Sequence, residues 1–202
     1  MQMSSRGGGE RRYGAVSIGL HWTIAVLILV QIGLGWYMNN VVPDHTPAQA
    51  RIEWLHISLG LTILLLVLAW IAVRLSHAVP RLAAGAPRWE RVLAACSHGL
   101  FYVLLLALPL TGWAMVSAGS HPITFWGVTW PHLPGLGALS DPPNRSLRHD
   151  LKQIHTSILV WSILANLALH VAGAIKHQFD GRPVFWRMAP FARPRPVAAP
   201  KP

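Results

Sequence analysis

Five histidines lie inside long apolar segments of this 202-residue chain, where ionisable side chains are rare. They are His21, His56, His98, His155 and His170. An ionisable group is costly to place in an apolar surrounding and usually has a functional role there. A hydrogen bond between two helices would explain one such histidine. Five of them favour the binding of a metal or of a metal-containing group.

The spacing of these histidines sorts them into two levels. His155 and His170 are 15 residues apart, which in an α-helix is roughly 22 Å along the axis and about 60° around it. They therefore face one interior at opposite ends of a helix. The apolar segments that contain these histidines are expected to cross a membrane in alternating directions. His56 lies two residues past Trp54, at the start of its segment, and therefore shares the level of His155. His21 and His98 share the level of His170.

Two levels of imidazoles on facing helices fit two haem groups, each with one histidine on either face of the iron. Zinc or copper would need a tighter cluster of converging ligands. The level of His170 holds three histidines in all, so a metal site there stays an alternative, and depth alone does not select the pair. The single cysteine, Cys96, excludes an internal disulfide, a cysteine-ligated iron–sulfur cluster and a cysteine-rich zinc site.

The histidines belong to four apolar segments that are long enough to cross a membrane, a length of about 20 residues. The chain is 52% apolar and only 12% charged, about half of the roughly 25% typical of soluble domains. The sequence therefore predicts an all-α, integral membrane four-helix bundle. The expected helices span residues 15–38, 54–74, 92–117 and 151–175.

The distribution of basic residues predicts the orientation of this bundle. Thirteen of the 17 Lys and Arg residues lie on the side that carries both termini, and four lie on the other side. Cytoplasmic loops carry such an excess, so we expect both termini to be cytoplasmic. Nucleic-acid binding would need basic residues gathered on one folded face. Here they lie between apolar segments, so the net charge of +10 indicates membrane lipid as a partner and no nucleic acid.

Composition divides the chain into three regions. Residues 1–12 are expected to form a disordered cytoplasmic N-terminus, residues 13–190 the transmembrane domain, and residues 191–202 a disordered tail rich in Pro and Arg. The loop at 119–150 is rich in Pro, Gly and His and is too long for a simple connection. We expect it to fold over the outer face of the bundle.

Two residues near the inner surface could assist a haem or a quinone. Arg74 follows His56 by 18 residues, so it points the same way and lies about 27 Å further in. Its guanidinium suits the propionate carboxylates of an inner haem, although membrane anchoring explains it equally well. His177 follows His170 by seven residues. It could contact a quinone oxygen or be a surface histidine.

Basic residues also precede His155 on its own helix. Arg148 and Lys152 lie about two turns and one turn before it. They could hold the propionates of an outer haem, attract an anionic substrate together with Arg145, or form a solvated helix end. Glycines at the outer level could admit a flat macrocycle, or could serve helix packing. They are Gly35, Gly60 and Gly112.

Four stretches of the sequence resemble the bacterial cytochrome b561 family of four-helix, dihaem membrane cytochromes. The resemblance covers residues 13–190 and implies that the fourth helix ligates both haem b groups. It pairs His21 with His170 and His56 with His155, and it leaves His98 without an iron. The stretches are Ser17-Ile18-Gly19-Leu20-His21-Trp22, Leu55-His56-Ile57-Ser58-Leu59-Gly60, the run from His98 to Gly112, and the run from His170 through His177-Gln178-Phe179 to Pro190.

The resemblance implies an electron carrier of the bacterial inner membrane that connects an outer-side donor with the quinone pool. Some members of the family oxidise superoxide and reduce ubiquinone, so this chain could be a superoxide:ubiquinone oxidoreductase. An outer-side redox protein is the other donor. One alternative is a cytochrome b anchor subunit of a dehydrogenase or reductase. Another is a non-redox transporter or haem shuttle, which would place charged residues at mid-membrane; residues 23–31 and 58–70 contain none.

Overall fold

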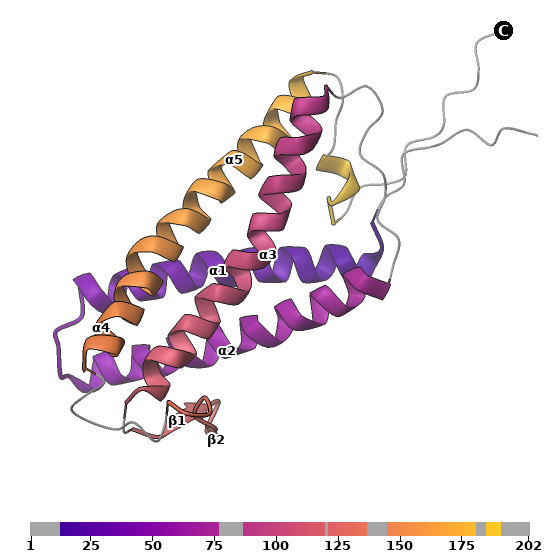
Figure 1. Cartoon of the computed structure of the whole chain (residues 1–202). Coiled ribbons are helices and arrows are strands. Elements are labelled where there is room, and N and C mark those ends of the chain that lie inside the picture. Colours follow the sequence, from indigo (N-terminus) through magenta and orange to yellow (C-terminus); the bar gives the residue numbers. More distant parts are fainter. Residues whose placement is uncertain (1–12, 77–86, 120, 137–144, 181–184, 191–202) are drawn as a thin grey trace, which may run out of the picture.

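Four long helical rods build the protein in a computed structural model that describes residues 13–76, 87–119, 121–136, 145–180 and 185–190 (Figure 1). All four are long and apolar enough to cross a membrane, as the sequence predicted. The predicted terminal regions 1–12 and 191–202 lie outside the described residues. The first three rods are α1 (Ala15–Asn40), α2 (Pro47–Ser76) and α3 (Arg88–Ser117).

The fourth rod consists of three consecutive pieces. It begins as α4 (Arg145–Gln153), continues as a π-helix, η1 (Ile154–Leu159), and ends as α5 (Val160–Phe179). It therefore starts earlier and ends later than the predicted 151–175. A short 3₁₀ helix, η2 (Phe185–Arg187), follows it.

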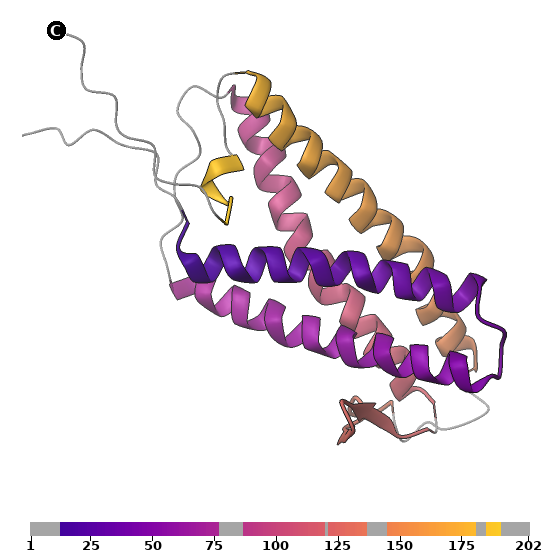
Figure 2. The same ribbon diagram turned by 180° about the vertical axis from the view of Figure 1, so that it is seen from behind.

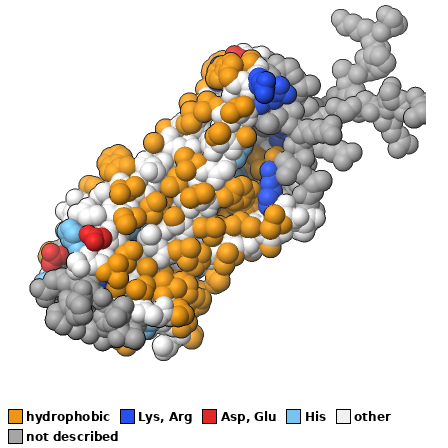
Figure 3. All heavy atoms as spheres, in the orientation of Figure 1, with side chains coloured by type: hydrophobic (Ala, Val, Ile, Leu, Met, Phe, Trp, Pro, Cys, Tyr) orange, Lys and Arg blue, Asp and Glu red, His pale blue; other side chains and the backbone are white. Residues whose placement is uncertain are grey.

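The helices are apolar around their whole circumference, which is typical of membrane-spanning segments. Large apolar side chains such as Val103 and Trp161 are 61% and 70% exposed on the bundle exterior. In Figure 3 apolar side chains cover the body of the bundle, and the visible charged groups lie toward its two ends. In lipid, a helix satisfies all of its backbone hydrogen bonds internally, so this composition selects helices.

A compact apolar core holds the rods together between the two histidine levels. Its buried members come from all four rods. Next to the core, Ser97 on α3 donates to Asn166 Oδ1 on α5 at 2.9 Å, and Asn166 Nδ2 donates back to the Ser97 carbonyl at 3.1 Å. This reciprocal pair fixes α3 against α5 within the membrane-spanning region. The core residues are Ile24, Ile28, Ile63, Val67, Leu104, Leu105, Leu108 and Ile163.

The region predicted as the 119–150 loop contains a small antiparallel hairpin of β1 (Ile123–Phe125) and β2 (Val128–Trp130), and its last residues belong to α4. The two-residue turn of the hairpin has positive φ at both Trp126 and Gly127, the backbone form that matches the twist of a hairpin. The Trp126 indole donates to Thr62 Oγ1 of α2 at 3.0 Å. The hairpin therefore packs along the side of α2 (Figures 1 and 2).

The start of α1, the end of α2 and the segment after α5 meet at one end of the bundle. The Tyr13 N–H donates to the Arg187 carbonyl at 3.3 Å, and the Trp22 indole donates to the Met188 carbonyl at 2.7 Å. Arg74, in the last turn of α2, lies 5.7 Å from the centre of the Tyr13 ring. These contacts place both ends of the described chain on one side of the bundle.

Candidate haem sites

One histidine pair joins the second and fourth rods. His56 projects from α2 and His155 from η1, and their ring centres are 6.2 Å apart. Two imidazole nitrogens bound to opposite sides of one metal, each at roughly 2 Å, place the ring centres roughly 6 Å apart. The pair therefore has a separation that would suit two histidines holding one haem iron between them.

The second pair joins the first and fourth rods near their other ends. His21 of α1 and His170 of α5 have ring centres 6.4 Å apart, so they meet the same distance criterion. His98 of α3 lies closer to His170, at 5.4 Å, with the rings inclined at 69°. His170 is thus flanked by both residues that the sequence places at its level. The separation favours His21 as the opposing ligand and places His98 in edge contact.

The π-helix η1 changes the direction in which His155 points. The offset of about 60° between His155 and His170 assumes an uninterrupted α-helix. A π turn contains one extra residue because its hydrogen bonds run from i to i+5, and one residue corresponds to about 100° of α-helical rotation. The 60° offset applies to an uninterrupted α-helix and is not expected across η1. Such π segments are frequent at functional sites, and no residue pattern in the sequence signalled this one.

Two glycines make room for the imidazoles of the His56–His155 pair. A Cβ on Gly35 would lie 3.3 Å from His56 Cε1, and a Cβ on Gly112 would lie 3.2 Å from His155 Cε1. The predicted level of both glycines agrees with these contacts. Their absent side chains leave space for the two imidazole rings, whereas the sequence left open a macrocycle or helix packing as the use of that space. Gly60 serves a different purpose, because a Cβ there would lie 3.2 Å from the amide nitrogen of Gln31.

The two imidazoles of this pair differ in their outer hydrogen bonds. The hydroxyl of Thr111 on α3 lies 3.1 Å from His155 Nδ1. His56 Nδ1 is buried and has no hydrogen-bond partner among the described residues. Gln31 of α1 instead donates to the His56 backbone carbonyl at 2.8 Å, which ties α1 to α2 beside the ligand. Thr111 was not predicted as a site residue, although it immediately precedes Gly112 at the end of the run from His98 to Gly112.

Arg74 and the His21–His170 pair lie at the same end of the bundle. Arg74 is half-buried, and its guanidinium packs over the Tyr13 ring. A cation in this position can pair with carboxylates that leave the adjacent histidine level. The structure places Arg74 at the end of the bundle where α1 begins, and its role toward a haem stays a prediction.

Arg148 and Lys152 lie on α4, before the His56–His155 pair, and both are exposed. The Arg148 guanidinium packs against Gly119 at the end of α3, where its Cζ is 3.6 Å from the position of a glycine Cβ. The Lys152 carbonyl accepts a hydrogen bond from Thr156 at 2.8 Å. The two cations are therefore accessible to a soluble anion on this face of the bundle.

His177 belongs to a charged cluster at the end of α5. Glu90 in the first turn of α3 is almost buried, with 6% of its side chain exposed, and accepts a hydrogen bond from Lys176 at 2.7 Å. His177 Nδ1 lies 3.9 Å from the other Glu90 oxygen, and Lys176 also pairs with Asp180. Glu90 was not predicted as a site residue. Its position as an acidic residue among basic ones could have indicated it.

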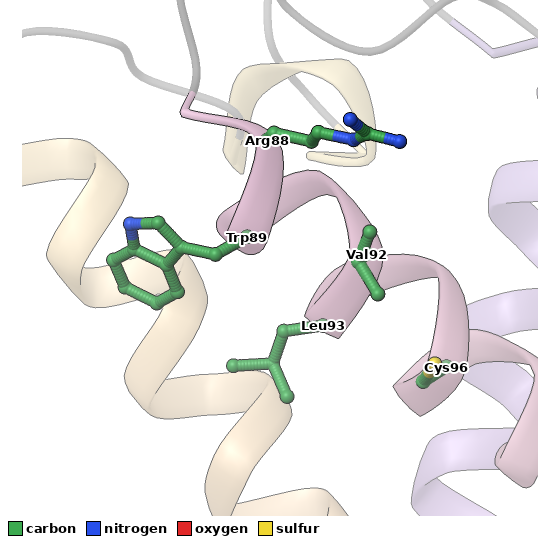
Figure 4. A pocket seen from close by; sticks show the side chains of 5 residues that line it. All are labelled: Arg88, Trp89, Val92, Leu93 and Cys96. Atoms are coloured by element: carbon green, nitrogen blue, oxygen red, sulfur yellow. The ribbon is translucent and has the colours of Figure 1, made fainter.

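The described structure also has an open apolar groove along α3, lined by Arg88, Trp89, Val92, Leu93 and Cys96 (Figure 4). Cys96 precedes His98 by two residues, so the two side chains point about 200° apart around the helix. The groove therefore lies on the face of α3 that is turned away from the histidines.

Four membrane-length helices that carry paired imidazoles at two levels define an integral membrane protein of the cytochrome b class. The chain belongs to the prokaryotic cytochrome b561 family, which its sequence matches over residues 12–191. The resemblance identified in the sequence is thereby confirmed. Membership implies b-type haem and electron transfer in a membrane.

Named relatives agree with this family. The chain is 26% identical over 174 residues to a Yersinia pestis protein named probable superoxide oxidase CybB, covering 84% of this chain and 90% of that protein. It is 24% identical to cytochrome b561 homolog 2 of Escherichia coli K12 over 168 residues, covering 83% and 85% of the two chains. Cytochrome b562 of Cereibacter sphaeroides is 33% identical over 106 residues, or 51% and 65% of the two chains.

Proposed function

We propose that this protein carries electrons across the membrane through two b-type haems. His21 and His170 hold one haem, and His56 and His155 hold the other. The observation that carries the proposal is the pair of ring separations, 6.4 Å and 6.2 Å, both of which suit an iron between two imidazoles. The fourth rod contributes one ligand to each pair and so fixes both sites to a single element.

The residues around the two pairs define what this chain contributes. A bound b-type haem supplies a one-electron couple, and the chain sets its ligation. Because two histidines would hold each haem, the group would supply electron transfer at each site. Thr111, Gly35 and Gly112 hold or accommodate the ligand rings. Arg74 would neutralise the propionates at the His21–His170 level.

We propose a quinone, with ubiquinone as the first choice, as the partner at the His21–His170 end. The His177 side chain is 20% exposed, and an imidazole N–H can donate a hydrogen bond to a quinone carbonyl oxygen. Two one-electron sites suit a carrier that takes up two electrons. The 13 basic residues on this side of the chain support a cytoplasmic location for this end and for both termini, in a bacterial inner membrane.

We propose superoxide as the donor at the opposite end, ahead of an outer-side redox protein. The relative from Yersinia pestis is named a probable superoxide oxidase. Exposed Arg148 and Lys152 lie one to two turns before His155, where positive charge would raise the local concentration of a small anion. In this reading the chain is a superoxide:ubiquinone oxidoreductase.

A pyridine haemochrome measurement on the purified full-length protein tests the proposal. We expect two haem b groups per chain. The double substitution His155→Ala with His170→Ala should abolish haem binding, because it removes one ligand from each pair. The matched control is His121→Ala with His149→Ala, at exposed positions outside both pairs, and it should retain both haems. A wild-type protein without haem would refute the proposal and favour a non-redox role.

A further inference from the structure

We propose that Thr111 is a positioning residue for the haem at the His56–His155 pair. Its hydroxyl accepts a hydrogen bond from His155 Nδ1 and thereby leaves Nε2 free to bind iron. This inference rests on the proposed function, since it concerns the ligation of one of the two haems. It adds a residue that selects the tautomer of a ligand and adjusts its strength.

The neighbours of the Thr111 hydroxyl oxygen indicate the direction of its hydrogen bond to His155. Oγ1 lies 2.7 Å from the Ala107 carbonyl, 2.9 Å from the Leu108 carbonyl and 3.1 Å from His155 Nδ1. A hydroxyl has one proton, and carbonyl oxygens only accept. The shortest of these distances, to the Ala107 carbonyl, favours donation of the Thr111 proton to its own helix, and we infer that Nδ1 is the donor in the bond to His155. A neutral imidazole has a single N–H, so Nε2 has a free lone pair.

The local structure of α3 keeps Thr111 in this role. A threonine within a helix commonly bonds back to a carbonyl three or four residues earlier, and this bond to the Ala107 or Leu108 carbonyl holds its side chain in place. The next residue, Gly112, would place a Cβ only 3.2 Å from His155 Cε1, so its absent side chain gives the ring room. Thr111 and Gly112 thus orient the same imidazole, one by a bond and the other by free space.

A hydrogen bond at Nδ1 makes an imidazole a stronger donor to its metal. The stronger donor stabilises oxidised iron more than reduced iron. Loss of such a partner typically changes metal binding by about 10- to 100-fold. If the lower value applies to the preference for oxidised iron, the midpoint potential should rise by about 59 mV, the equivalent of tenfold for one electron. The haem at the His21–His170 pair should be unaffected.

The variant Thr111→Val removes the hydroxyl and keeps the side-chain shape, whereas Thr111→Ser keeps the hydroxyl. Thr156→Val is the matched control, because Thr156 also bonds back to its own helix but makes no hydrogen bond to an imidazole among the described residues. Each purified full-length protein is assayed for haem content and titrated spectroscopically for two midpoint potentials. His56→Ala, which should keep only the other haem, assigns the two potentials.

We expect Thr111→Val to raise only the potential of the His56–His155 haem, and Thr111→Ser and Thr156→Val to match the wild type. If Thr111→Val loses this haem, retention in Thr111→Ser still assigns the effect to the hydroxyl. Two unchanged potentials in Thr111→Val, or an equal effect in Thr111→Ser, would overturn the inference. A wild-type haem content below two per chain would instead refute the proposed function, so the two failures are distinguishable.

Discussion

Replacing Gly112 with Ala should weaken the haem site at the His56–His155 pair through a single steric contact. The added Cβ would lie 3.2 Å from Cε1, 3.6 Å from Nδ1 and 3.9 Å from Nε2 of His155. Carbon atoms pack favourably at about 3.5–4.0 Å, so the ring would have to move by about 0.3–0.8 Å. Thr111 holds the ring at Nδ1, and the proposed iron would hold it at Nε2. The ring therefore has little freedom to move.

Overpacking of this kind typically destabilises a structure by about 1–3 kcal/mol. If this strain is present only when His155 binds iron, the affinity for haem falls by about 5- to 150-fold. The change from Gly to Ala also favours the helix by about 1 kcal/mol. Gly99 lies on the same helix and would meet nothing within 4 Å. Gly99→Ala therefore provides the same helix propensity without the contact.

The assay compares Gly112→Ala with Gly99→Ala in purified protein. Haem content comes from the pyridine haemochrome, and the rate of haem loss comes from transfer to an excess of a soluble haem-binding apoprotein. Gly112→Ala should lose one haem faster than Gly99→Ala, and the second haem should dissociate equally slowly from both. Gly35→Ala should resemble Gly112→Ala, because its Cβ would lie 3.3 Å from His56 Cε1. Equal rates in all three variants would refute the steric reasoning.

Three further predictions test the remaining assignments. Replacing either histidine of one pair with Ala should remove one haem and leave the spectrum of the other intact, whereas His98→Ala should keep both; loss of a haem in His98→Ala would show that the pairing is wrong. A reporter fused after Arg195 should be cytoplasmic and one inserted near Pro134 should be outside, as the basic-residue bias predicts; the reverse result in protease-accessibility assays would invert the proposed sides. Neutralising Arg148 and Lys152 together should slow stopped-flow haem reduction by superoxide and weaken its dependence on ionic strength, with haem content unchanged; equal rates and salt slopes would exclude electrostatic steering.

The sequence alone determined the four helices and the levels of the histidines. A segment of about 20 apolar residues in lipid must satisfy its own backbone hydrogen bonds, and a single chain segment does so only as a helix. The position of a residue along the helix axis then follows from its number, because the helix rises by about 1.5 Å per residue. This is why His56 could be assigned to the level of His155 before the structure was considered. The family was likewise evident in local runs such as the one around His21.

The rotation of each helix about its axis, and the side chains that each residue contacts, depend on elements that are distant in the chain. Only the tertiary structure decided them. The π-helix that contains His155 adds one residue to a turn, which shifts the positions of residues around the helix. Thr111 reaches this ring from a position 44 residues earlier, and Glu90 meets Lys176 across 86 residues. Residue spacing predicts depth because the helical rise is constant. It cannot predict these contacts, because they depend on how neighbouring helices rotate and pack.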